Sequence, residues 1–159
     1  MSKPRPEPRS ASVRKTDTLA KLQAIGEDVW VASASASQRG EALPYLVPLS
    51  LAWIDDRVVV ALGADSRTAL NVKQSGLARL ALGRTRDVVV IDATLDRAIP
   101  AEEIDADLAQ RYAAQADWDP REERGDYVYL VLRPVRIQAW REANELTGRT
   151  LMRTGDWLV

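Results

Sequence analysis

The chain has 159 residues and a formal net charge of −1, with 46% hydrophobic and 28% charged residues. A chain of this length fits one domain that buries roughly 70% of its unfolded surface, and its net charge does not attract nucleic acid or an anionic membrane. Cysteine and histidine are both absent, which excludes disulfides, thiol chemistry, the usual zinc sites and triads that use histidine as the base. Any catalysis therefore depends on carboxylates, Tyr, Lys, water or a cofactor, which favours cofactor chemistry such as hydride transfer.

The N-terminal segment divides into a polar tail and a short helix. Residues 1–15 are rich in proline and cations and almost free of apolar side chains, so we predict a disordered tail. A short amphipathic helix follows, with Thr16 or Asp17 as its N-cap and Gly26 as its end. Its apolar face has helical spacing: Leu19, Leu22 and Ile25. Because we find neither a signal sequence nor an apolar stretch of about 20 residues, we expect a cytoplasmic protein.

Strand patterns dominate after this helix. Alternating or continuous apolar residues predict six principal strands in hairpin order: 29–37, 44–54, 58–63, 77–85, 87–99 and 127–140. A helix from Pro100 to about Asp117 separates the last two strands, and residues 149–159 predict a short terminal strand or hook. A doubly wound α/β fold would need a helix after nearly every strand. We therefore predict a mainly β fold, a closed or split antiparallel barrel of six strands, as one domain over residues 16–159.

Pro48 lies in the middle of the second predicted strand. Proline cannot donate a hydrogen bond to a neighbouring strand, so it predicts an edge strand or a bulge. Ser50 lies on the same face, two positions later. Two interpretations are open: a plain edge strand, or a strand whose freed backbone groups face a flat ligand.

The stretch "GADSRTALNVKQSG", residues 63–76, connects two apolar runs. Asp65 or Ser66 can cap a short helix and the final glycine can end it, so folding alone explains these residues. It does not explain Arg67 and Thr68, because a cation in the first turn opposes the helix dipole. With free backbone N–H groups, the guanidinium and the hydroxyls would form an anion site, although the charge of Asp65 would compete for the same donors. The stretch is therefore either a capped helix or a phosphate cradle.

These features together resemble a known family. The sequence "PYLVPLSLAWIDDRVVVALGADSRTALNVKQSGLARLAL" is similar to the core motif of the pyridoxamine 5′-phosphate oxidase-like split-barrel family. That motif has a strand ending in Val-Pro-hydroxyl, a hairpin with a turn of Asp/Gly type, and a Ser-Arg-Thr/Lys-x-x-Asn-Leu sequence that opens a short helix. The resemblance spans most of residues 27–99. More loosely, the C-terminal sequence "AWREANELTGRTLMRTGDWL" is similar to the tail of some flavin- and deazaflavin-binding members.

The resemblance implies a six-stranded split barrel that dimerises, with FMN or the 8-hydroxy-5-deazaflavin coenzyme at the subunit interface. It implies that one group of residues lines the isoalloxazine ring: Val47, Pro48, Leu49 and Ser50. It implies that a second group holds the ribityl phosphate: Ser66, Arg67, Thr68 and Asn71. Trp140, near the C-terminus, either reaches the cofactor of a partner subunit or has a packing role. FMN is the first choice of cofactor and the deazaflavin coenzyme is the alternative.

The predicted strands also carry tryptophans and arginines. We assign Trp30 and Trp53 to the core or to an interface, because they lie on alternating strands. Three arginines lie close together along one strand and turn: Arg79, Arg84 and Arg86. Two interpretations of these arginines are open: a basic edge that discourages strand pairing, or a surface that receives the anionic tail of a cofactor.

We expect a flavin- or deazaflavin-dependent oxidoreductase that transfers hydride to or from a small unsaturated or carbonyl substrate. The alternative is a non-catalytic protein that binds or carries the cofactor, because hydride transfer at a flavin needs few protein groups. An oligonucleotide-binding barrel would need exposed aromatic platforms and a basic groove, which 6% aromatic residues and a charge of −1 do not favour. We expect a homodimer with a small-molecule substrate, without a metal site, nucleic acid or membrane as a partner.

Overall fold

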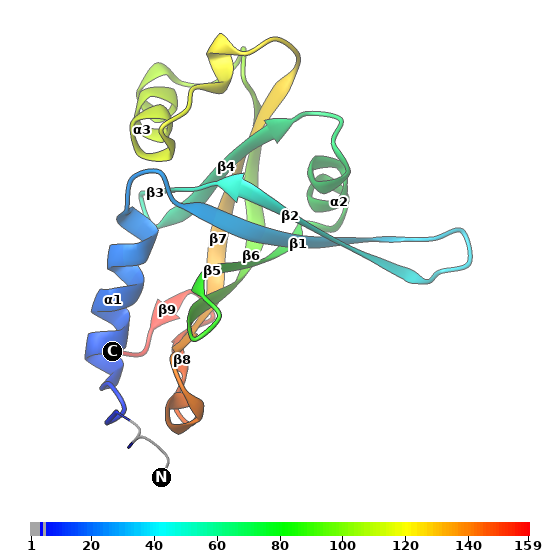
Figure 1. Ribbon diagram of the computed structural model, residues 1–159. Helices are drawn as coiled ribbons and strands as arrows, with labels where there is room; N and C mark the ends of the chain where they lie inside the picture. Colours follow the sequence, from blue (N-terminus) through cyan, green and yellow to red (C-terminus); the bar gives the residue numbers. More distant parts are fainter. Residues whose placement is uncertain (1–3, 5) are drawn as a thin grey trace.

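A computed structural model describes residue 4 and residues 6–159 of the chain (Figure 1). The helices are α1 (Ala11–Gln23), α2 (Arg67–Ser75) and α3 (Ala106–Ala116), with two 3-10 helices, η1 (Pro120–Glu122) and η2 (Ala143–Glu145). The strands are β1 (Asp28–Ala36), β2 (Ala42–Ser50), β3 (Ala52–Ile54), β4 (Arg57–Gly63), β5 (Leu77–Arg84), β6 (Asp87–Pro100), β7 (Tyr127–Trp140), β8 (Thr150–Arg153) and β9 (Asp156–Trp157). No helix in the described part of the chain is long and apolar enough to cross a membrane.

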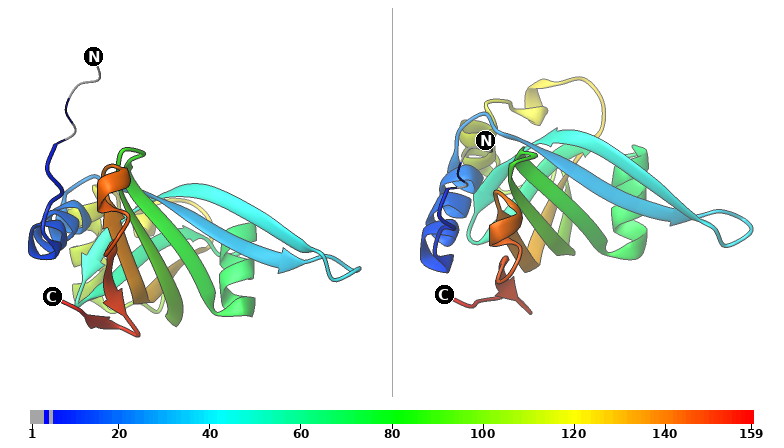
Figure 2. Two further views of the ribbon diagram at one scale, coloured as in Figure 1. Left: turned by 90° about the horizontal axis from the view of Figure 1, so that it is seen from below. Right: turned by 60° about the horizontal axis from the view of Figure 1, so that its bottom comes forward.

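The strands form one antiparallel sheet in the order β2-β1-β5-β6-β7-β4-β3, which β8 and β9 extend from β7. The sheet is strongly curved, and β2 and β3 are the ends of its main order (Figure 2). The predicted mainly β, antiparallel class is confirmed. The sheet has nine strands rather than the predicted six, and it is open: within residues 6–159 no ladder joins its two ends into a closed barrel.

The chain changes its strand partners at Leu51. The sequence predicted one strand over residues 44–54, but the chain forms β2 as far as Ser50 and β3 from Ala52. β2 pairs with β1, whereas β3 pairs with β4 at the opposite end of the sheet. Between them the N–H of Leu51 donates to the carbonyl of Glu27 at 3.0 Å, and the Leu51 side chain is fully buried. One residue therefore holds the two ends of the sheet close together.

The curved sheet encloses the main hydrophobic core, to which α1 and α2 contribute. A second, smaller core lies where α3 covers β3, β4 and β7. Its centre is Tyr112, whose hydroxyl donates to the carbonyl of Ser50 at 3.1 Å and accepts from the N–H of Ala61 at 3.2 Å. Because these bonds satisfy backbone groups at the end of β2 and in β4, they attach α3 to the point where the chain changes partners.

The turn before β4 and the start of α3 test the predicted boundaries between elements. Asp55 and Asp56 both adopt left-handed backbone conformations, with φ of 50° and 57°, between the paired Ile54 and Arg57, so the hairpin turn of Asp/Gly type in the motif is confirmed. The predicted start of the third helix at Pro100 is wrong, because Pro100 is the last residue of β6. Helix α3 begins at Ala106 because the carboxylate of Asp105 accepts a hydrogen bond from the N–H of Leu108 at 3.1 Å, which makes Asp105 the N-cap.

Helix α1 begins earlier than the sequence predicted. Its N-cap is Ser10, whose Oγ accepts from the N–H of Val13 at 3.2 Å, so the predicted caps at Thr16 and Asp17 are wrong. The predicted tail over residues 1–15 is correspondingly too long, because residues 11–15 are helical; residues 1–3 and 5 lie outside the described part. The buried face consists of Arg14, Thr18 and Leu22. Ile25 was predicted to belong to this face, but it lies beyond the helix and is 75% exposed.

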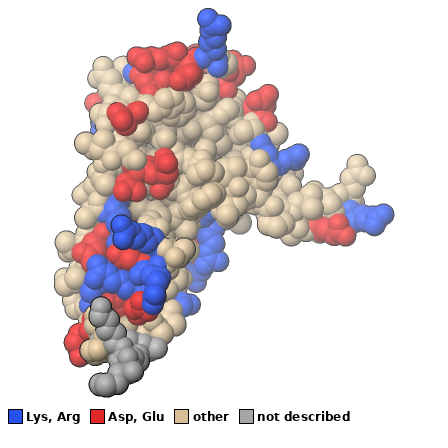
Figure 3. Space-filling model, in the orientation of Figure 1, with Lys and Arg blue, Asp and Glu red and all other residues tan. Residues whose placement is uncertain are grey.

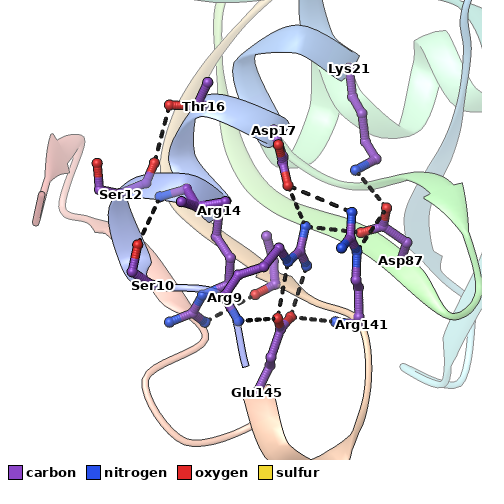
Figure 4. Close-up of polar contacts among 12 residues, drawn as sticks. Arg9, Ser10, Ser12, Arg14, Thr16, Asp17, Lys21, Asp87, Arg141 and Glu145 are labelled. Atoms are coloured by element: carbon purple, nitrogen blue, oxygen red, sulfur yellow. Dashed lines mark hydrogen bonds and ion pairs between the residues drawn. The ribbon is translucent and has the colours of Figure 1, made fainter. Parts of the chain in front are cut away.

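A cluster of ion pairs attaches the N-terminal segment to the rest of the fold (Figure 4). The backbone N–H and the guanidinium of Arg9 donate to the carboxylate of Glu145 in η2 at 2.8–3.0 Å. The same guanidinium contacts Asp17 of α1 at 2.8 Å and Asp87 of β6 at 3.3 Å. Glu145 is 3% exposed and also accepts from the N–H of Arg141 at 2.8 Å. The Arg9 guanidinium therefore connects the N-terminal segment to α1, β6 and η2.

Glu145 is expected to make the stability of the fold depend on pH. Hydrogen bonds from Arg9 lower the pKa of Glu145 from 4.5 to about 2. Because the pKa is lower in the folded protein, the stabilisation is fully present above pH 4.5 and is lost as the pH falls toward the folded-state value. The shift corresponds to on the order of 3 kcal/mol of unfolding free energy.

Denaturant unfolding near neutral pH and again in acid, at about pH 3, measures this effect. We expect the unfolding free energy of the wild type to fall steeply between the two conditions, and that of Glu145→Gln to fall much less. Glu142→Gln is the control, because Glu142 pairs only with the exposed Arg86 among the described residues. Equal losses in wild type and Glu145→Gln would contradict the prediction.

Candidate functional site: the start of helix α2

Helix α2 connects β4 to β5, and capping residues fix both its ends. Ser66 Oγ accepts from the N–H of Ala69 at 3.3 Å, and Gly76 ends the helix in the left-handed conformation with φ of 70°. Both features follow from side-chain and backbone preferences at helix termini. Of the two caps that the sequence allowed, Ser66 is the cap and Asp65 is exposed. The helix is therefore held at its ends before any ligand is considered.

Asn71 positions the helix on the sheet. Its side chain is 2% exposed, and Nδ2 donates to Ser33 Oγ in β1 at 3.1 Å. At the exposed side Lys73 Nζ donates to the carbonyl of Ala64 at 3.2 Å, which ties the helix back to the segment before it. As a result α2 contacts β1 and β2 (Figure 1). The amide nitrogen of Asn71 is therefore already engaged in a hydrogen bond within the fold. Its predicted contact with a phosphate remains a prediction.

Hydrogen-bond donors without partners gather in the first turn of α2. Thr68 is 1% exposed, and its Oγ1 has no hydrogen-bond partner within the described residues. In that same part of the chain, no acceptor lies at the backbone N–H groups of Arg67 and Thr68, and the exposed Arg67 guanidinium pairs with no carboxylate. A buried hydroxyl without a partner costs about 1–3 kcal/mol. The helix dipole adds positive potential at the same end, so the turn is suited to accept an anion.

Strand β2 lies beside this turn with one edge free. It is at the end of the sheet order, which confirms the edge strand that Pro48 predicted. The register places Val47 and Leu49 on the same face as Ser33, because directly paired residues of antiparallel strands share a face. These two half-buried side chains therefore lie on the side of β2 that carries α2.

Pro48 and Ser50 lie on the opposite face of β2, since side chains alternate along a strand. Pro48 is exposed opposite Trp30, and the Ser50 carbonyl accepts from Tyr112. The four residues predicted to line a flavin ring therefore do not present their side chains to one side. A flat ligand that contacts all four would lie along the free backbone edge of β2.

Trp140 lies apart from the first turn of α2. It is near the end of β7 and lines a groove together with Trp30, and no residue of α2 lines that groove. Within one chain the structure brings together β1, β2 and the α2 residues, whereas Trp140 shares a groove with Trp30 of β1 and Leu46 of β2 but with no residue of α2. The approach of Trp140 to the cofactor of a partner subunit remains a prediction.

Two residues that build this site were not singled out from the sequence. Ser33 anchors α2 through Asn71, and Tyr112 holds the end of β2. The only signal for Ser33 is its place among alternating small residues in "VASASAS", which is equally typical of a solvent-facing strand. Tyr112 lies in the helix predicted from Pro100 to about Asp117, but its hydrogen-bond partners lie 62 and 51 positions away in the chain. The described residues contain no cluster of acidic side chains that would hold a metal ion.

The fold is shared with solved structures of low sequence identity. One is an F420 reductase, with a TM-score of 0.57 and 13% identity over 74% of this chain and 94% of the other. A second, from Listeria innocua, is named after pyridoxamine 5′-phosphate oxidase and has a TM-score of 0.59 and 15% identity over 80% of this chain and 98% of the other. A third is a heme-binding protein from Mycobacterium smegmatis, with a TM-score of 0.57 and 17% identity over 92% of this chain and 59% of the other.

No family model and no curated protein matches the sequence. The structural likenesses confirm that the chain has the fold of pyridoxamine 5′-phosphate oxidase-like proteins, as the motif in residues 27–99 predicted. At these identities they establish the fold alone. Since proteins with different ligands share it, the choice of ligand depends on the residues of the site.

The structure assigns the cap of α2 to Ser66, so its loss is expected to destabilise the fold. Ser66→Ala removes the acceptor of the Ala69 N–H and is expected to lower the unfolding free energy by about 1 kcal/mol. The matched control is Asp65→Ala, one position earlier, which is expected to stay within about 0.5 kcal/mol of wild type. Thermal and denaturant melts of both variants measure the difference. A larger loss in Asp65→Ala than in Ser66→Ala would assign the cap to Asp65 instead.

Proposed function

We propose that the protein binds the phosphate of FMN, or of the 8-hydroxy-5-deazaflavin coenzyme, at the start of α2 and acts as an oxidoreductase. The observation that carries the proposal is the buried Thr68 hydroxyl without a hydrogen-bond partner in the described chain. It adjoins two free N–H groups and the exposed Arg67 guanidinium. Folding alone leaves this hydroxyl unsatisfied, whereas a phosphate oxygen accepts from hydroxyl, N–H and guanidinium groups at once.

The proposed contacts divide between the first turn and the neighbouring strand. Arg67 and Thr68 hold the phosphate, Ser66 fixes the turn by capping it, and Asn71 fixes the helix on β1. The isoalloxazine lies along the free edge of β2, from Val47 to Ser50, where unpaired backbone groups face it. When bound, the cofactor supplies hydride chemistry. The chain's own residues bind and orient it.

The likeness to an F420 reductase supports a reductive activity on a small unsaturated or carbonyl substrate. FMN remains the first choice and the deazaflavin coenzyme the alternative, since both carry a ribityl phosphate. Binding without turnover is the alternative function. Anaerobic incubation of the loaded protein with a reductant and a panel of enones and ketones distinguishes the two: cofactor reoxidation that depends on substrate supports the enzyme.

Arg67 and Thr68 provide the direct test of the cradle. Arg67→Ala is expected to raise the Kd for FMN by about 10- to 150-fold, the range for loss of a charge-assisted hydrogen bond of about 1.5–3 kcal/mol. Its unfolding free energy should stay within about 0.5 kcal/mol of wild type, because the side chain is exposed. Thr68→Val replaces the unpaired hydroxyl by a methyl group of the same shape. It is therefore expected to leave the stability unchanged or increased while it weakens FMN binding.

Binding is measured by titration of FMN and, separately, of the deazaflavin coenzyme, with tryptophan fluorescence or calorimetry. Arg124→Ala is the control for the loss of a surface cation, because Arg124 is exposed in the loop before β7. An Arg67→Ala protein that binds FMN as tightly as wild type would contradict the cradle. Weak binding of both cofactors by the wild type itself, above about 100 μM, would contradict the whole proposal.

We also propose that the protein is a homodimer and that the cofactor site is completed between two copies, as in a split barrel. Large apolar side chains of β1, β2 and β5 are exposed: Trp30, Leu43, Tyr45, Leu46 and Leu77. The β1–β2 hairpin also projects well beyond the body of the molecule (Figures 1 and 3), where it can contact a second chain. Sedimentation equilibrium at micromolar concentration is expected to give a dimer mass. A monomer mass across this range would contradict the proposal.

A further inference from the structure

We propose a second binding site, for a free amino acid with an apolar side chain, in a cleft between the two tight turns that join β3 to β4 and β8 to β9. The cleft has a volume of about 320 Å³, at the lower end of the range of small-molecule sites. The turn residues Asp56 and Thr154 form part of its lining. None of the residues proposed to hold the cofactor or to contact a second copy lines it, so the proposed function leaves this cleft unused.

The cleft lies at a gap in the strand pairing of β7. One side of β7 is occupied by β6. On the other side β4 pairs with β7 only as far as Leu132, and β8 begins to pair only at Arg136. Residues 133–135 therefore have no strand beside them on this side, where the N–H of Gly155 in the β8–β9 turn donates to the carbonyl of Val135 at 3.0 Å. The gap leaves room for a ligand between the two hairpins.

Backbone strain is concentrated at the two turns that flank the cleft. Asp56 and Thr154 adopt the left-handed conformation, with φ of 57° and 53°, and the neighbouring Asp55 does so with φ of 50°. Of the other non-glycine residues that the structure describes, only Asp117 has a positive φ. This conformation is especially unfavourable for Thr154, because its side chain is branched at Cβ. Residues held in such conformations cluster at ligand sites, which supports a binding role for the cleft.

Two cations and two anions line the cleft without pairing with one another. Arg57 and Arg133 contact the same carboxylate, that of Asp96, at 3.2 and 2.9 Å, so each guanidinium keeps further N–H donors. Asp56 and Asp156 line the same cleft, and neither carboxylate has an ion-pair or hydrogen-bond partner in the described part of the chain. Guanidinium groups bind a carboxylate and carboxylates attract an ammonium group. The charges of the lining therefore match a zwitterion.

The apolar part of the lining defines the side chain of the ligand. Pro134 and Met152 are buried, and Trp157 is partly buried. Lys15 of α1 holds the Trp157 indole, with its ammonium nitrogen 5.0 Å from the ring centre. A proline ring, a thioether and an indole together provide an apolar surface beside the charged groups. An amino acid with an apolar side chain therefore satisfies both parts of the cleft.

Isothermal titration calorimetry with L-phenylalanine tests the site on the full chain. We expect binding with a Kd below about 1 mM. The analogue L-phenylalaninamide lacks the carboxylate, and 3-phenylpropanoate lacks the ammonium group. Each is expected to bind about 10-fold more weakly or not at all. Arg133→Gln and Asp156→Asn each remove one charge that faces the ligand and are expected to weaken binding of L-phenylalanine by about 10-fold. Thermal melts confirm that each variant is folded.

Arg136→Gln is the matched control and is expected to bind L-phenylalanine as the wild type does. Arg136 lies on β7 like Arg133, and it pairs with Asp92 as Arg133 pairs with Asp96, but it does not line the cleft. Asp92 also pairs with Arg79 of β5, which is an internal strand and not the basic edge that was one interpretation of the sequence.

Equal binding of the three compounds would overturn the recognition of a zwitterion, and equal losses in Arg133→Gln and Arg136→Gln would overturn this cleft as the site. Absence of binding by the folded wild type at millimolar L-phenylalanine would overturn the proposal as a whole. The titration is repeated in the presence of FMN. Unchanged binding supports a separate site, whereas displacement of L-phenylalanine by FMN would show that it occupies the cofactor site instead.

Discussion

The passage of the chain from β2 to β3 through Leu51 is the constraint on which the rest of the structure depends. These two strands stand at opposite ends of one sheet, yet a single residue connects them. The sheet must therefore curve until its ends nearly meet. The curvature encloses the main core, and the buried side chain of Leu51 and the hydroxyl of Tyr112 hold the connection in place.

The same constraint creates the features on which a site can be built. β2 has no strand on its outer side, so its backbone groups remain available along the whole length that contains Pro48. The helix after β4 is brought beside β2 and is attached to β1 by the bond between Asn71 and Ser33. Its first turn consequently has a fixed position relative to the free edge. A turn of unsatisfied donors beside an unpaired strand edge is a geometry for a ligand with an anionic group and a flat body.

The two faces of the β1–β2 region differ in their chemistry. On the α2 side a single buried hydroxyl and free N–H groups point to a compact anion such as a phosphate. On the opposite side Trp30 and Trp140 line one groove, and the Arg149 guanidinium lies 5.3 Å from the ring centre of Trp140. Away from both faces, the buried ion cluster around Glu145 attaches the N-terminal segment and α1 to η2 and to Arg141 after β7. Figure 3 shows that charged side chains gather around this cluster and at the tip of the hairpin, while much of the surface between them is uncharged.

The sequence by itself determined the local elements of this protein. Apolar alternation located most strands, a cap at Asp65 or Ser66 and the glycine at position 76 bounded α2, and Pro48 marked an edge strand or a bulge, because each of these signals depends on neighbouring residues alone. The motif in residues 27–99 also identified the fold, which the solved structures confirm. Tertiary structure alone decided that one apolar run would divide at Leu51, since both halves are equally strand-like and only their distant partners differ. It likewise decided that the Thr68 hydroxyl would be buried without a partner and that Trp30 and Trp140 would face one groove. These arrangements depend on which strands become neighbours. Trp30 and Trp140 are 110 positions apart in the chain, and the residues around each of them do not indicate that the two lie close together in the fold.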